Sequence, residues 1–284
     1  MKTKILSCGA ALALALLSSC SSNESAPATT TVTTAAITVD AKIDASVDDV
    51  ANIVEDQYTV QQGLTNKSTG TIKSMLPLCA TITTVLTNGT WTRTIDFGTQ
   101  GCALPNGNTV KGKITISFVN NFTSLSQTIT YTLDGFYHND KKIEGTKTII
   151  RTLKSSDLLV AVHPISTCTL DLTITFADGK VYKRTGTRVK EMTEGFDTKS
   201  NWEDNVFLVW GTGNTTFPDG SVYTATIKTP LRFVMTCHLP FPVLGSVSIT
   251  KNQSEAVIDF GTGICDNLAT VTILAVTKEI TLEK

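Results

Sequence analysis

The sequence lacks the features by which most catalytic, metal-binding and nucleic-acid-binding proteins are recognised. It contains no Cys-x-x-Cys pair and no Gly-x-Ser-x-Gly motif, and none of its three histidines is spaced with a cysteine as in zinc sites. Its 24 basic and 25 acidic residues nearly cancel, so it has no charge excess of the kind that binds nucleic acid. We therefore expect a protein without a metal, a cofactor or a nucleic-acid partner, and not an enzyme.

The N-terminal residues have the form of a bacterial lipoprotein signal. Two lysines precede a short apolar stretch, and Leu17-Ser18-Ser19-Cys20 matches the lipobox, in which the cysteine is acylated and becomes the mature N-terminus. We expect residues 1–19 to be removed and Cys20 to anchor the protein to the outer membrane, on either its periplasmic or its surface face. Residues 20–38, rich in Ser, Thr and Ala, are expected to form a flexible tether.

One block of the mature chain occurs twice. Residues 79–102 read CATITTVLTNGTWTRTIDFGTQGC, and residues 237–265 also open with Cys and close on IDFGT-x-x-Cys. A two-residue turn at Asn88-Gly89 sets residue 79 opposite residue 98, near the closing cysteine, and an exported protein can form disulfides. The sequence therefore predicts two disulfides and one leftover buried thiol: Cys79–Cys102, Cys237–Cys265 and Cys168.

The hydrophobic pattern changes once along the chain. Between residues 44 and 58, apolar residues recur at helical spacing, with Asp44 or Ser46 as the expected cap and the acids away from the apolar stripe. After Leu76 the pattern alternates with period two, and short turn signals such as Asp178-Gly179 separate the runs. We predict a mainly β single domain over residues 39–284. It would be an antiparallel meander of hairpins, in a curved sheet or two packed sheets, with one N-terminal helix covering a face or end.

A few residues are candidates for a site. The least regular segment, residues 194–205, carries Trp202, and Trp210 lies in the next strand, so these two are the expected ligand contacts. His138 beside Asp140 resembles an acid/base pair, but we interpret the two as exposed turn residues. The aspartates of the two IDFGT segments are expected to accept backbone N–H bonds in the glycine bend. Seven aromatic residues could stack on a glycan or stabilise cross-strand pairs: Trp91, Trp202, Trp210, Phe136, Tyr137, Tyr182 and Tyr223.

A resemblance to a known family extends over residues 75–284. It rests on segments such as IDFGTQGC, NGNTVKGKITI, FADGKVYKRTGTR and IDFGTGICDNLATVTI. The chain resembles a family of uncharacterised lipoproteins of Bacteroidota, of the flavobacterial type. The resemblance implies a fold and an envelope location and no reaction.

We therefore expect an envelope lipoprotein with a non-enzymatic binding or structural role, whose partner is an envelope protein, a glycan or a lipid. A periplasmic carrier of a lipid or other apolar ligand is the alternative, and it would need an apolar cavity of several hundred Å³ between sheet and helix. A hydrolase is a third possibility. It would need a cleft where a histidine meets an acid and a nucleophile.

Overall fold

The computed structural model describes residues 31–66, 72–198 and 201–283, and this part of the chain begins with one long helix. Helix α1 (Thr34–Thr65) starts where the Thr33 side chain accepts a hydrogen bond from the N–H of Ala36. The predicted helix over residues 44–58 is its middle, and the last five residues of the expected tether are helical. Neither Asp44 nor Ser46 caps it, because both lie within the helix.

Fifteen strands follow in the described residues, and all of their pairings are antiparallel. Their bounds are β1 (Thr81–Thr87), β2 (Thr90–Asp96), β3 (Cys102–Ala103), β4 (Thr109–Val119), β5 (Ser126–His138), β6 (Lys141–Glu144), β7 (Thr146–Lys154), β8 (His163–Thr175), β9 (Val181–Glu194), β10 (Val206–Thr216), β11 (Val222–Val234), β12 (Leu244–Lys251), β13 (Ser254–Thr262), β14 (Leu268–Ile273) and β15 (Val276–Thr281). They form one sheet in which consecutive strands pair, except β2 with β3 and β6 with β7, so the predicted antiparallel meander is confirmed.

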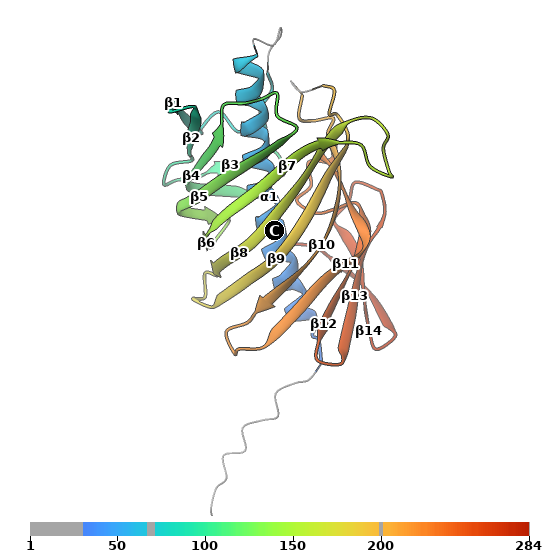
Figure 1. The fold of residues 1–284 in the computed structure, drawn as a ribbon. Coiled ribbons are helices and arrows are strands. Elements are labelled where there is room, and N and C mark those ends of the chain that lie inside the picture. Colours follow the sequence, from blue (N-terminus) through green and yellow to red (C-terminus); the bar gives the residue numbers. More distant parts are fainter. Residues whose placement is uncertain (1–30, 67–71, 199–200, 284) are drawn as a thin grey trace, which may run out of the picture.

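The sheet curves around α1, which crosses its concave face (Figure 1). From Ile43 onward the helix packs residues such as Ile43, Val54 and Tyr58 against the strands from β2 to β9. Its N-terminal turns pack Ala36 and Ile37 against the strands from β10 to β14. Burial of each large aliphatic side chain contributes about 1.5–3 kcal/mol, so the contacts at both ends hold the helix along its length.

The turn chemistry determines the register of the hairpins. Asn88 and Gly89 both have positive φ, 49° and 74°, and the pairs from Thr87↔Thr90 to Thr81↔Asp96 follow without a shift. The ladder ends at Thr81↔Asp96, so Cys79 lies in the turn just beyond it and is not itself paired with residue 98. The predicted turns at Asn139-Asp140, Asp178-Gly179 and Asp219-Gly220 also join strands directly.

Both predicted disulfides are present: Cys79–Cys102 has a Cα–Cα distance of 6.0 Å and Cys237–Cys265 one of 5.4 Å. The expected role of the aspartates is also confirmed, since Asp96 and Asp259 accept the N–H of Gly98 and Gly261, each at 2.8 Å. In both blocks the first cysteine lies outside a strand, because Cys79 is in the turn before β1 and Cys237 ends the 3₁₀ turn η1 (Met235–Cys237). The remaining thiol, Cys168, is buried on β8 as predicted.

Candidate binding cavity between helix and sheet

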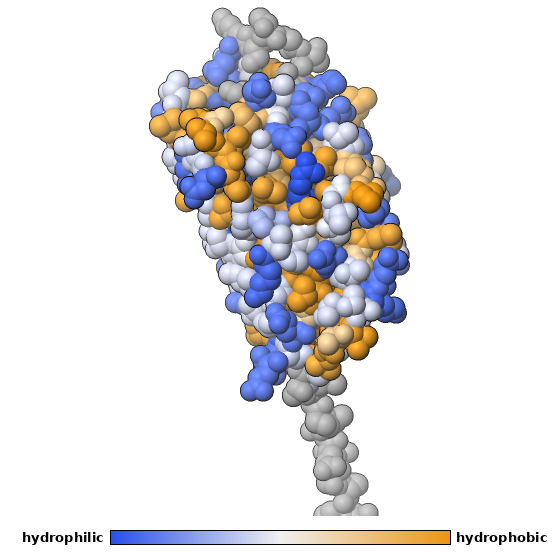
Figure 2. Space-filling model, turned by 90° about the vertical axis from the view of Figure 1, so that its right-hand side faces the viewer, coloured by the Kyte–Doolittle hydropathy of each residue, from blue (hydrophilic) through white to orange (hydrophobic). Residues whose placement is uncertain are grey.

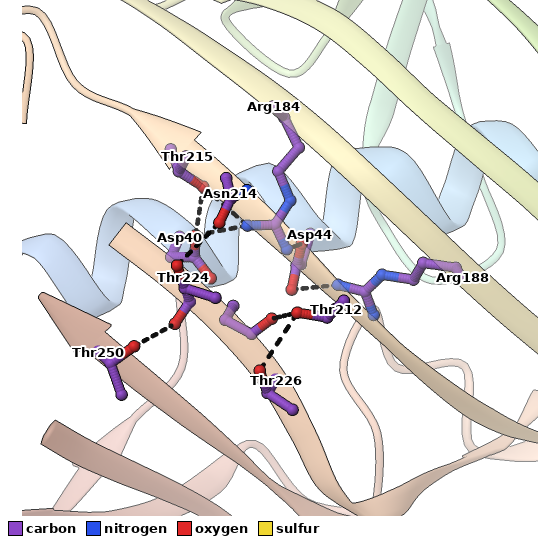
Figure 3. Close-up of polar contacts among 11 residues, drawn as sticks. Asp40, Asp44, Arg184, Arg188, Thr212, Asn214, Thr215, Thr224, Thr226 and Thr250 are labelled. Atoms are coloured by element: carbon purple, nitrogen blue, oxygen red, sulfur yellow. Dashed lines mark hydrogen bonds and ion pairs between the residues drawn. The ribbon is translucent and has the colours of Figure 1, made fainter. Parts of the chain in front are cut away.

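The interface between α1 and the sheet is charged on one side. Asp40, Asp44 and Asp48 recur every fourth residue and so lie on one stripe of the helix. The stripe faces Arg184 and Arg188, which project from the same face of β9 (Figure 3). Arg184 binds Asp40 at 2.9 Å and Asp44 at 2.6 Å, and Arg188 also pairs with Asp44.

Burial and neighbouring charge act differently on the three carboxyl groups. Burial raises the pKa of Asp48 from 3.8 to about 6, against the lowering effect of Arg188, 3.9 Å away. Burial also raises the pKa of Asp40, although Arg184 opposes it. At Asp44 burial is outweighed by the two arginines, which hold its pKa below the ordinary value. The network therefore contains one strongly paired carboxylate and two whose burial is imperfectly compensated.

Further along α1 the interface opens into a cavity of about 60 Å³. One wall is the helix from Asn52 to Val60, and another is the concave face of β7 to β10. The third is formed by residues between β9 and β10, namely Gly195, Phe196, Asn201, Trp202 and Asn205. A water molecule needs roughly 10–15 Å³ by this measure, so the space corresponds to about four to six water-sized groups.

The lining of this cavity is soft and apolar on one side. Every methionine of the sequence except Met1 contributes to it, namely Met75, Met192 and Met235. Phe207 and Trp202 complete this side. Methionine is flexible and polarisable, and such linings adapt to the shape of what they contact.

Arg151 supplies a buried positive charge to the same lining. Arg151 on β7, Ser166 on β8 and Lys190 on β9 are cross-strand neighbours and form one row on the concave face. Lys190 pairs with Glu55 and also donates to Asn52 at 2.8 Å. Arg151 is 8% exposed and makes no hydrogen bond or ion pair within the described part of the chain.

The Arg151 guanidinium lies 5.2 Å from the centre of the Tyr58 ring, a cation–π contact. Burial lowers the pKa of Arg151, while Tyr58 and Glu55 partly offset that effect. Arginine remains charged at neutral pH in proteins. The cavity therefore contains a cation whose charge is not neutralised by a direct partner.

Three smaller spaces of about 30, 20 and 30 Å³ lie along the same interface. Asn52 lines the cavity and the first two of these spaces, and Asp48 and Phe233 line all three. The spaces continue along α1 toward the Asp40 and Asp44 pairs. In the described residues the interface thus contains a row of small cavities and not the chamber of several hundred Å³ that a carrier would need.

The two predicted contact residues are separated by the sheet. Trp202 is half-buried in the cavity wall, in the loop that follows β9 as expected. Trp210 follows Val209, which is buried on the helix side, so alternation along β10 directs Trp210 to the opposite face. The seven aromatic residues do not line a common groove, because Phe136, Tyr182 and Tyr223 are buried.

His138 is the clearest departure from expectation. It is not an exposed turn residue but 1% exposed, because the last residues of β5 lie beneath α1. Its Nδ1 lies 3.1 Å from Ser46 Oγ and its Nε2 lies 2.8 Å from Asp49 Oδ2, an arrangement with the composition of a hydrolase triad. However, Ser46 has no exposed surface and donates to the carbonyl of Lys42 at 2.9 Å. A substrate could reach this serine only if the helix left the sheet.

A second polar cluster lies near the mouth of the cavity. His163 Nε2 is 2.8 Å from Glu191, its Nδ1 is 2.6 Å from the carbonyl of Ala161, and Ser156 donates to Glu191 at 2.6 Å. The His163 ring lies 5.9 Å from that of Phe196, which lines the cavity. The cluster thus ties the β7–β8 loop to β9, next to Phe196.

Sequence reasoning missed Arg151 and the helix-facing arginines of β9. The available signal was the alternation within β7, which puts Lys147, Ile149 and Arg151 on one face. The isoleucine marks that face as buried, so the two cations beside it must be buried as well.

Comparisons with known proteins add no relative. No protein-family model matches the chain, and neither a curated protein nor a solved structure matches it significantly. Within the described residues, no helix has the length and apolar character needed to cross a membrane. Nor does this part of the chain bring together three or more His, Cys, Asp or Glu side chains in a way that could hold a metal ion.

Proposed function

We propose that this protein is an envelope lipoprotein, held to the membrane by an acylated Cys20, that binds a ligand without transforming it. The observation that carries the proposal is the partly enclosed cavity under Trp202, lined by adaptable methionines. Small-molecule sites are typically concave and mostly apolar, with a few polar groups that fix the orientation of the ligand, and this cavity has that character on a small scale.

The polar groups in the cavity support binding in preference to catalysis. Glu55 is engaged with Lys190. Asp56 accepts hydrogen bonds from Ser74, Gln57 and the Met75 N–H, at distances from 2.6 to 3.2 Å. These contacts connect elements of the fold and leave neither carboxylate poised as a base toward the cavity.

A reporter variant tests the proposal. Replacing Trp91 and Trp210 with Phe leaves Trp202 as the only tryptophan. The probe is a panel of neutral, anionic and cationic fragments of four to eight non-hydrogen atoms. We expect at least one fragment to change Trp202 fluorescence saturably.

Val60→Phe, which fills the cavity from α1, should abolish that response, and Val181→Phe, on an exposed position of β9, should not. A panel without any saturable response, or one insensitive to Val60→Phe, would contradict the proposal. The anchor is tested separately, because Cys20→Ser should move the protein from the membrane fraction to the soluble fraction.

One observation favours lipid carriage as a second candidate function, which would require the small cavities between α1 and the sheet to widen. The β7–β8 loop presents a run of consecutive apolar residues in which Leu158, Val160 and Val162 are 57%, 89% and 62% exposed. Figure 2 shows the side of the molecule that lies on the right in Figure 1, and hydrophobic groups are interspersed with hydrophilic ones on this side. Exposed aliphatic runs of this kind mark contact sites.

The loop is also pre-formed. Ser156 Oγ accepts the N–H groups of Leu158 and Leu159, both at 3.1 Å. A carrier would use this loop to dock on a bilayer near the cavity mouth. We expect Val160→Asp to reduce co-flotation of the unacylated protein with phosphatidylethanolamine–phosphatidylglycerol vesicles, and Val222→Asp, also on an exposed valine, to leave it unchanged. Absence of flotation by the parent protein would remove carriage as a candidate.

A further inference from the structure

We propose that the ligand is a compact organic anion, a carboxylate or phosphate bearing a short apolar group, whose charged end is bound by Arg151. This inference rests on the proposed function and specifies the ligand chemistry of the same cavity.

The first argument is the charge left over in the cavity. Lys190 and Glu55 form an ion pair and cancel. Asp56 is held by three hydrogen-bond donors, and the nearest cation to influence it is Arg93. Arg93 in turn donates to Gln57 at 2.8 Å and also to Gln61. Arg151 is the remaining charged group in the lining that is buried and without a partner in the described residues.

An unpaired buried cation is costly, and the cost is relieved by an anion that completes the pair. A guanidinium presents a planar fork of N–H donors that matches carboxylate and phosphate oxygens. In Arg151 this fork has no acceptor among the described residues, and its stem is fixed by the β7 ladder and the Tyr58 ring. The group is therefore positioned before any ligand arrives, which reduces the entropy lost on binding.

The second argument is size. A space of about 60 Å³ holds a group equivalent to about four to six waters. Inorganic phosphate or a four-carbon carboxylate fits these limits, whereas a long acyl chain would need α1 or the Trp202 loop to move. The methionine side of the cavity, with Met192 and Met235, then receives the apolar part of the ligand.

Titration calorimetry with four probes tests the inference: butyrate, butyramide, inorganic phosphate and decanoate. Butyrate and butyramide have the same shape and differ in charge. We expect butyrate or phosphate to bind the full mature protein, and butyramide to bind at least 30-fold more weakly than butyrate, because it cannot pair with the guanidinium.

Variants of Arg151 provide the second readout. Arg151→Met keeps most of the volume and should lower anion affinity at least 30-fold, and Arg151→Lys should lower it about tenfold because the fork is lost. Arg232→Met is the matched control, because Arg232 pairs with Glu194 at the surface and does not line the cavity. It should bind like the parent protein.

The outcomes separate this inference from the function on which it rests. One contrary result is that neutral fragments bind under Trp202 while butyramide binds as tightly as butyrate, and another is that Arg151→Met binds anions with the affinity of the parent protein. In either case the cavity is a binding site and the inference is wrong. If no fragment of any charge binds, both fail. Tighter binding of decanoate than of butyrate would contradict the compact ligand, because the cavity would then have to admit a long acyl chain. Tighter binding of phosphate than of butyrate would support the inference and assign the anion to a phosphorylated compound.

Discussion

Replacing Asp48 with Asn should make the protein more stable at neutral pH, although Asp48 lies in an ion-pair network. Its side chain is 18% exposed, and its carboxylate is 3.9 Å from the nearest Arg188 nitrogen. Arg188 keeps Asp44 as a closer partner, so the substitution does not leave the arginine unpaired. It removes a charge whose burial is incompletely compensated.

The pKa gives the sign and the size. Burial raises the pKa of Asp48 from 3.8 to about 6, so between those pH values the folded state binds a proton that the unfolded state has lost. The free energy of unfolding therefore falls as pH rises through this window. At about 1.4 kcal/mol per pH unit, the ionised carboxylate costs the folded state about 3 kcal/mol above pH 6. Asp48→Asn should recover most of this at pH 7.5 and almost none at pH 4.

Urea unfolding at pH 4.0, 5.0, 6.0 and 7.5 measures the effect. Asp44→Asn, one helical turn away, is the matched control of opposite sign, because the pKa of Asp44 is lowered by two arginines. Its loss should destabilise the protein by about 3–5 kcal/mol at pH 7.5. Asp171→Asn, on an exposed position of β8, should change little. If Asp48→Asn is less stable than the parent at pH 7.5, or equally stabilised at pH 4, burial does not dominate at this site and the reasoning is wrong.

Two further substitutions test the interior and the disulfides. Lys147 is 2% exposed, and burial lowers its pKa from 10.5 to about 8. Lys147→Met should therefore raise the free energy of unfolding by about 3 kcal/mol at pH 7, and this gain should shrink between pH 8 and 10.5 as the folded parent sheds its proton. Replacing Cys79 and Cys102 together with Ser should lower stability by about 3 kcal/mol in the same urea assay, through loss of loop-closure entropy. An unchanged urea midpoint would show that the first cystine block does not constrain the unfolded chain.

Local chemistry explains why the hairpins were predictable. An Asn-Gly turn requires positive φ at both central residues, so Asn88 and Gly89 fix a register that the neighbouring strands must follow. The same argument located the disulfides and the aspartates that accept Gly98 and Gly261. Each of these features depends on residues close in sequence. They could therefore be predicted without knowledge of how the whole sheet is arranged.

The helix and its site depend instead on contacts that no local pattern contains. The spacing of Asp40, Asp44 and Asp48 is typical of a solvent-exposed stripe on a helix. Their burial is tolerated only because of cationic partners such as Arg184, which is 144 residues from Asp40 in the sequence. On β9 the alternation rule assigns Arg184 and Arg188 to one face without saying that a charged helix covers it. Arg151 is a further buried cation on the concave face of the sheet, but the nearby Glu55 of α1 is already paired with Lys190. The cavity therefore contains a cation without a matching acid, and we infer that the missing negative charge is supplied by the ligand.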